Sequence, residues 1–144
     1  MMNAKEYLEQ VSRAEKEVRV IQAKIDHYRD VALSMSSHFA DAPIRASTPS
    51  SRVETVAVGI VDALEEWNAN LGAYKAIIDR AEKLIDRIPQ ERYRLLLKYR
   101  YLCGWDLQRV GRELQYTDRN SIYRAHGWAL LEMGKILEEV KDND

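Results

Sequence analysis

Side chains that could read nucleic-acid bases gather within two helical turns after Asp118. Arginine presents paired donors that match the acceptors of guanine, and asparagine presents a donor and an acceptor that match adenine. If a helix begins here, the polar and basic residues of its first turns lie away from its apolar positions. These side chains are Arg119, Asn120, Tyr123 and Arg124. Their chemistry is recognition of base edges in the major groove of double-stranded DNA.

Two basic residues and a threonine just before this run could hold the DNA backbone. Arg109, Arg112 and Thr117 are candidates to contact phosphates and fix the register. Residues 89–137 carry nine basic and five acidic side chains, a balance of +4, whereas residues 1–88 carry twelve and fourteen. A polyanion is therefore expected to bind at 89–137. A solvated basic surface and a protein-binding use of the same segment are the alternatives.

The sequence offers no constellation typical of an enzyme. It contains no glycine-rich phosphate loop, no Ser-His-Asp arrangement and no HExxH motif. Glu65 and Glu66 project in different directions on a helix, so they are no acid/base pair. One cysteine, Cys103, excludes an internal disulfide and a four-thiolate zinc site. His27 and its neighbouring aspartates are typical of a solvated helix surface, so we expect no metal site. Because no catalytic motif is present either, we expect no enzyme activity and no cofactor.

The composition predicts an all-α protein with long elements. Six glycines and three prolines in 144 residues leave few turns. No apolar run approaches the roughly 20 residues needed to cross a bilayer, and the N-terminus lacks the apolar core of a signal peptide. We therefore expect a soluble cytoplasmic protein with no membrane partner.

Two long heptad patterns predict a coiled-coil-like antiparallel helical hairpin over residues 1–88. Apolar residues recur at spacings of three and four from Ala4 to Phe39 and again from Val53 to Ile88. The proline- and serine-rich residues 38–52 are expected to form the loop, with Ser50 or Ser51 as the N-cap of the second helix.

The apolar side chains of the second pattern exceed what a lone hairpin can bury. Trp67 and several tyrosines widen the apolar stripe. We therefore expect a homodimer or a higher homo-oligomer. The residues expected to mediate it are Ile60, Leu64, Trp67, Leu71, Tyr74 and Ile78.

Shorter elements after Pro89 predict a helix-turn-helix over residues 89–137, followed by an acidic tail, 138–144. A helix is expected over 90–102, a turn at Cys103-Gly104, and a second helix over 107–114 capped by Asp106. After a turn at 115–117, Asp118 caps the recognition helix, 118–137. In that helix, His126 is expected to bond a backbone group, and Trp128 to pack against the arm or the first helix of the module.

About 50 residues of this segment resemble region 4 of the sigma-70 family, the part that reads the −35 promoter element. The matching residues include Ile88-Pro89, Arg94–Leu97, Tyr99–Leu102, Gly104, Asp106, Val110-Gly111, Leu114, Tyr116, Asp118, Ile122, Tyr123, His126 and Ala129-Leu130. Gly111 stands where the family usually has alanine, and Gln115 where it usually has glycine. The segment is most similar to small phage and prophage proteins of the kind of the ArpU and RinA regulators of late genes.

This resemblance implies a sequence-specific transcriptional regulator of phage or prophage genes in a bacterial host cell. Its fold would be a long antiparallel helical hairpin followed by a compact sigma-70 region-4-like helix-turn-helix. Double-stranded DNA would be the partner, and host RNA polymerase is a candidate for the hairpin. Two alternatives remain open: a DNA-packaging adaptor like a small terminase subunit, and a protein that binds RNA polymerase without touching DNA.

Overall fold

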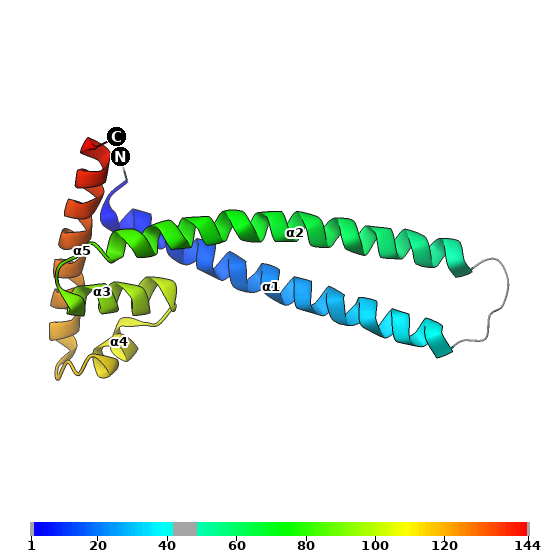
Figure 1. Cartoon of the computed structure of the whole chain (residues 1–144). Helices are drawn as coiled ribbons and strands as arrows, with labels where there is room; N and C mark the ends of the chain where they lie inside the picture. Colours follow the sequence, from blue (N-terminus) through cyan, green and yellow to red (C-terminus); the bar gives the residue numbers. More distant parts are fainter. Residues whose placement is uncertain (1, 42–48, 144) are drawn as a thin grey trace. The chain divides into compact units, whose positions relative to one another are not determined.

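Every regular element of the described chain is a helix, as the sequence predicts (Figure 1). The computed structural model describes the backbone of residues 2–41 and 49–143, and the side-chain environments of residues 2–35 and 54–143. No helix in these ranges is long and apolar enough to span a membrane. In chain order the elements are α1 (Ala4–Asp41), α2 (Pro49–Ile85), α3 (Glu91–Leu97), the π-helix η1 (Lys98–Leu102), α4 (Leu107–Glu113) and α5 (Arg119–Asp142).

The predicted loop at 38–52 is too long at both ends. Helix α1 continues to Asp41, and α2 already begins at Pro49. The rest of that loop, residues 42–48, lies outside the described residues. The expected N-cap at Ser50 or Ser51 is wrong because both serines lie inside α2. Proline suits the first turn of a helix, where its missing N–H has no partner to lose.

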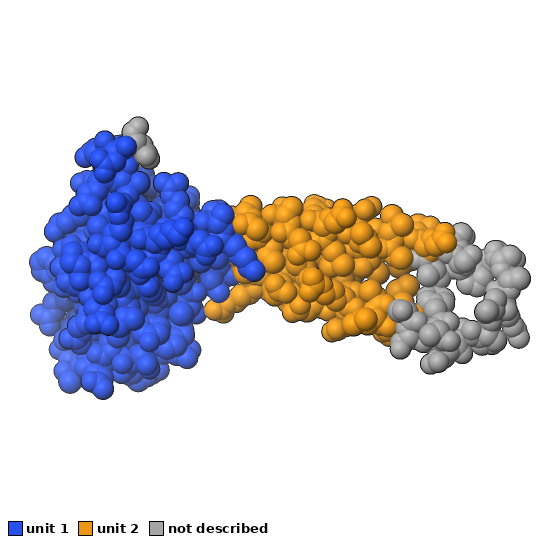
Figure 2. Space-filling model, in the orientation of Figure 1, with its two compact units in different colours: residues 1–16, 75–144 blue, residues 17–74 orange. Residues whose placement is uncertain are grey.

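The described chain forms two compact units (Figure 2). Unit 1 comprises residues 1–16 and 75–144, and unit 2 comprises residues 17–74. The division cuts both long helices, whereas the sequence suggests a boundary at residues 88 and 89. Residues 1–16 and 75–88 therefore pack with the C-terminal helices.

In unit 2, α1 and α2 lie side by side and run in opposite directions (Figure 1). Ile21, Ile25 and Leu71 are buried between them. The rings of Tyr28 and Trp67 meet at 5.1 Å between centroids. Around this cluster pack the half-buried Val18, Leu64, Trp67 and Tyr74.

Most of the predicted oligomerisation residues thus have partners within the chain. Leu64, Trp67, Leu71 and Tyr74 all belong to the unit 2 cluster. Ile60 in unit 2 and Ile78 in unit 1 are half-buried. A heptad pattern shows that a helix face is covered but not by which chain, so self-association through these residues stays a prediction.

One core holds unit 1 together, and the arm contributes to it. Leu8, Ile85 and Ile88 are completely buried with residues of the later helices. Their neighbours in the cluster include Leu96, Leu97, Tyr101, Val110, Ile122, Ala129 and Met133. Residues 89–137 therefore share their core with both ends of the predicted arm, which is why the division falls near residues 16 and 75.

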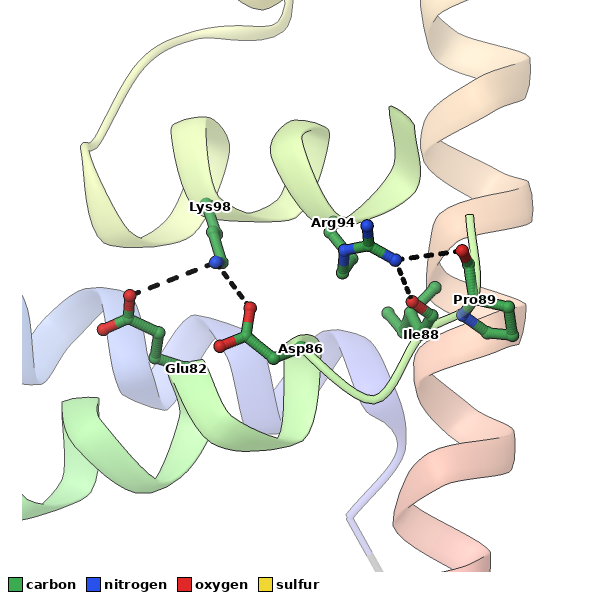
Figure 3. A network of polar contacts seen from close by, with 6 residues as sticks. All are labelled: Glu82, Asp86, Ile88, Pro89, Arg94 and Lys98. Atoms are coloured by element: carbon green, nitrogen blue, oxygen red, sulfur yellow. Dashed lines mark hydrogen bonds and ion pairs between the residues drawn. The ribbon is translucent and has the colours of Figure 1, made fainter. Parts of the chain in front are cut away.

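Arg94 and Lys98 connect α3 and η1 to the end of α2 and to the residues that follow it (Figure 3). Arg94 Nη1 donates to the carbonyl oxygens of Ile88 at 2.6 Å and Pro89 at 2.9 Å. Lys98 Nζ lies 2.6 Å from Asp86 Oδ1 and 4.0 Å from Glu82 Oε1. The carbonyl groups freed by the turn at Pro89 thus find donors in the next helix.

The predicted single helix over 90–102 has two parts, α3 and the π-helix η1. The amide of Cys103 donates to the carbonyl of Lys98 at 3.0 Å, a bond that spans five residues. Gly104 then adopts φ 76°, a left-handed conformation that glycine tolerates best. The predicted turn at Cys103-Gly104 is confirmed, and the wider π turn precedes it.

The expected acidic tail is mostly the last turns of α5, which extends to Asp142. Ile136 is buried, and Leu137 and Val140 pack against the unit 1 core. The charges of residues 138–144 predicted a tail, but apolar contacts on one side of α5 hold most of this segment against the unit 1 core.

Candidate nucleic-acid interface

Two aspartate caps set the beginnings of α4 and α5, as predicted. Asp106 Oδ1 accepts from the amide of Arg109 at 2.8 Å. Asp118 Oδ1 accepts from the amide of Asn120 at 2.6 Å, and its Oδ2 accepts from Ser121 Oγ at 3.3 Å. Each carboxylate satisfies amides that have no partner within the helix and opposes the positive end of the helix dipole.

The turn between α4 and α5 contains a strained residue. Gln115 has φ 63°, a left-handed conformation that side chains with a Cβ adopt at a cost. The amide of Tyr116 donates to the carbonyl of Gly111 at 2.8 Å and closes the end of α4. A glycine would adopt this conformation without that cost.

Helices α4 and α5 approach closely at Gly111. A Cβ at this position would lie 3.3 Å from the Cβ of Ile122, tighter than an ordinary contact. Val110 and Ile122 are buried in the same cluster. The expectation that Gly111 allows a close approach is confirmed, and the contact fixes the start of α5 against α4.

Six of the seven side chains that the sequence predicts to contact DNA are exposed around the turn between α4 and α5. In the described part of the chain, none of these six has an aromatic ring stacked closely on it. Arg112 and Arg119 line an open hollow of about 250 Å³ together with Thr117. Arg119 Cζ lies 5.9 Å from the ring centroid of Tyr123, which is 46% exposed. The six exposed residues are Arg112, Thr117, Arg119, Asn120, Tyr123 and Arg124.

The seventh, Arg109, is exposed but held by an aromatic ring. Its guanidinium carbon lies 3.8 Å from the ring centroid of Trp105. The ring of Trp105 stacks on that of Tyr99 at 4.4 Å with an interplanar angle of 8°. Sequence reasoning missed this aromatic support, although the spacing of four between Trp105 and Arg109 was a signal for it. An arginine oriented in this way loses less conformational entropy when it meets a phosphate.

Arg92 is a second cation that sequence reasoning missed. Its guanidinium carbon lies 4.4 Å from the ring centroid of Tyr116, and its Nη2 donates to the carbonyl of Leu114 at 3.0 Å. These contacts join α3 to the turn between α4 and α5. They hold Leu114 and Tyr116, which stand on either side of Gln115 in that turn.

His126 bonds a side chain, not the expected backbone group. Its Nε2 lies 2.8 Å from the hydroxyl oxygen of Tyr101. Burial lowers the pKa of His126, and the charges of Arg100 and Lys5 lower it further. Burial raises the pKa of Tyr101. Both groups are thus neutral near pH 7, and their hydrogen bond joins η1 to α5.

The expectation that Trp128 packs against the arm or the first helix is wrong, because its side chain is 60% exposed. It follows Gly127 and lies about 100° around α5 from the buried Ala129. One residue of displacement rotates a side chain by about 100° on a helix, which is enough to turn it from the core to the surface.

The arrangement presents donors and positive charge around an open hollow between α4 and α5. Within the described ranges, no three His, Cys, Asp or Glu side chains lie close enough together to hold a metal ion. No protein-family model, curated protein or solved structure matches the chain.

Proposed function

We propose that the protein is a sequence-specific DNA-binding regulator that places the first turns of α5 in the major groove. The observation that carries the proposal is the capped start of α5. There, Asp118 fixes the backbone while Arg119, Asn120 and Tyr123 stay exposed. Recognition of base edges in the major groove requires hydrogen-bonding side chains held on the first turns of a helix.

The surroundings of this helix start support backbone contacts on both sides. Arg112 and Thr117 lie in the same hollow as Arg119. Arg109 on α4 is oriented by Trp105. The nearby carboxylates of Asp106 and Asp118 accept from helix amides, which reduces their repulsion of phosphates. In this proposal α4 crosses the backbone and α5 enters the groove, as in a helix-turn-helix.

The regulatory part of the proposal rests on the resemblance to sigma-70 region 4 and on the antiparallel packing of α1 and α2 in unit 2. The whole chain would then be a helical hairpin followed by a sigma-70 region-4-like module. Such a chain would bind a promoter site in phage or prophage DNA. Its hairpin would offer a surface to a second protein, for which host RNA polymerase is the candidate.

The test is selection of double-stranded DNA from a random pool with the purified full chain, followed by affinity measurements on the enriched site. Arg119→Ala and Asn120→Ala should each weaken binding by about 1–3 kcal/mol and relax the preference at one base position. Binding should also weaken steeply as the salt concentration rises, since phosphate contacts release counterions.

The matched control is Arg29→Ala, which removes the same charge from an exposed position of α1 in unit 2. It should leave both affinity and sequence preference unchanged. Failure to enrich any sequence contradicts the proposal. So does an Arg119→Ala variant that binds every fragment as tightly as the wild type.

A further inference from the structure

The middle of α5 carries an apolar surface that the unit 1 core does not cover. Trp128 is 60% exposed and Leu131 is 58% exposed. Leu131 lies on the side of α5 opposite to the buried Ala129 and Met133, and Trp128 lies about 100° around the helix from Ala129. A Cβ added at Gly127 or Gly134 would meet nothing within 4 Å, so the helix surface is open beside the two large side chains.

A groove runs along this surface. It measures about 420 Å³, lies between the first residues of α1 and the middle of α5, and belongs entirely to unit 1. Its lining includes Ala4 from α1, together with Leu130, Leu131 and Gly134 from α5. Its apolar part and its two glycines, Gly127 and Gly134, suit a large apolar side chain that enters from outside.

Charges at the two ends of this surface have opposite sign. Arg124 lies toward the beginning of α5 and Glu138 toward its end, and both are exposed. Neither has an ion pair among the described residues. Together with Trp128, Leu131 and Lys135, they recur at the spacings of a coiled coil, at positions 124, 128, 131, 135 and 138.

We propose that α5 packs antiparallel against α5 of a second copy of this chain, with the two-fold axis at Leu131. Residues equally distant from position 131 then face each other. Trp128 of each chain meets the partner's Gly134 and enters the partner's groove. Arg124 of each chain lies opposite the partner's Glu138.

The charges and the sizes of the side chains favour this antiparallel arrangement over a parallel one. In a parallel pair, Arg124 would face Arg124 and Glu138 would face Glu138, which is repulsive at both ends. Trp128 would also face Trp128, while Gly134 would face Gly134 and leave a void. The antiparallel pair matches a large side chain with a small one and each charge with its opposite.

The second copy would use a different surface from the one that the heptad pattern of α2 predicts. Leu64, Trp67 and Leu71 already pack within unit 2. The proposed contact also assigns Arg124 to the interface and leaves Arg119 and Tyr123, which lie on another side of α5, for DNA. Because one helix per chain makes a small interface, the dissociation constant should lie in the micromolar range.

The experiment is sedimentation of the full chain across a concentration series without DNA, so its outcome is independent of DNA binding. Leu131→Asp should weaken dimerisation by more than about tenfold, because it places two carboxylates at the two-fold axis. The matched control is Leu33→Asp, since Leu33 is 69% exposed on α1 in unit 2. This variant should dimerise like the wild type.

Charge reversal tests the antiparallel register. Arg124→Glu places two glutamates opposite each other at each end and should weaken dimerisation by about tenfold. The double variant Arg124→Glu, Glu138→Arg restores opposite charges and should return the dissociation constant to near the wild-type value. Circular dichroism of each variant checks that the helices are retained.

Cross-linking tests the position of the axis. With Cys103→Ser in the background, Leu131→Cys should form a disulfide between two chains under mild oxidation, since both sulfurs lie on the axis. Leu33→Cys in the same background should not. A monomeric wild type at about 100 µM, far above the expected micromolar dissociation constant, overturns the proposal. So does a double charge variant that stays as weak as Arg124→Glu.

Discussion

At the residue scale, the pair of His126 and Tyr101 makes the stability of unit 1 depend on pH. His126 has a pKa below its usual value of 6.5 because burial disfavours its charged form. Between the lowered pKa and 6.5, the unfolded chain binds a proton that the folded chain does not. The stability contributed by neutral His126 is therefore complete above pH 6.5 and is lost as the pH falls through the lowered pKa.

We accordingly expect the free energy of unfolding of the wild type to fall more steeply than that of His126→Gln as the pH is lowered from about 7.5 to about 5. Denaturant titrations at several pH values measure this difference. The control is His27→Gln, because His27 is exposed on α1. Parallel pH profiles for the wild type and His126→Gln would contradict the assignment.

Gln115 is a residue whose replacement by glycine should stabilise the fold. A left-handed conformation costs a residue with a Cβ about 1–2 kcal/mol, and glycine does not bear this cost. Glycine also gives the unfolded chain more freedom, which offsets about 0.4–1 kcal/mol. Gln115→Gly should therefore raise the free energy of unfolding by up to about 1 kcal/mol in thermal or denaturant unfolding. A lower melting temperature than the wild type would contradict this.

At the element scale, the close contact of α4 with α5 decides how the candidate reading residues are presented. Gly111→Val should be destabilising by about 1–3 kcal/mol, because its side chain would overlap Ile122. It should also weaken DNA binding, since the start of α5 would move relative to α4. Chemical denaturation and DNA titration of the same variant measure the two effects.

The control for this prediction is a glycine on an open helix surface. A Cβ added at Gly59 in α2 would meet nothing within 4 Å. Gly59→Ala should raise stability by up to about 1 kcal/mol through helix propensity alone, without changing DNA affinity. If Gly111→Val were as stable as the wild type, α4 and α5 would not be in close contact at this position.

At the scale of the whole molecule, the proposed dimer sets the form of the DNA site. Arg119 lies twelve residues before Leu131, so the two Arg119 residues of an antiparallel pair lie about 36 Å apart along the helix axes. This separation is close to one turn of B-DNA, about 34 Å. The expected spacing depends on both the proposed function and the proposed dimer.

The selected DNA should therefore contain an inverted repeat with half-site centres about 10 bp apart. Insertion of about 5 bp between the half-sites places them on opposite sides of the duplex and should reduce the affinity to that of a single half-site. Insertion of about 10 bp returns the two half-sites to the same side of the duplex but leaves them too far apart for the dimer. The protein should therefore also bind this DNA weakly. Equal affinity for all three spacings would contradict this geometry.

Features that depend on near neighbours in the chain could be predicted from the sequence alone. The all-α class follows from the apolar spacing and the scarcity of glycine and proline. The caps at Asp106 and Asp118 bond amides two or three residues away. The close approach at Gly111 was also expected, because a missing side chain is visible in the sequence.

Only the tertiary structure decided what depends on distant parts of the chain. Leu8 and Ile85 join the core of the later helices, and Val140 packs where charge alone suggested a tail. Arg109 lies over Trp105, and Trp128 stays exposed although its residue type favours burial. A periodic pattern fixes which side of a helix is apolar. Which segment covers that side depends on the packing of the whole chain, and this packing left the middle of α5 open.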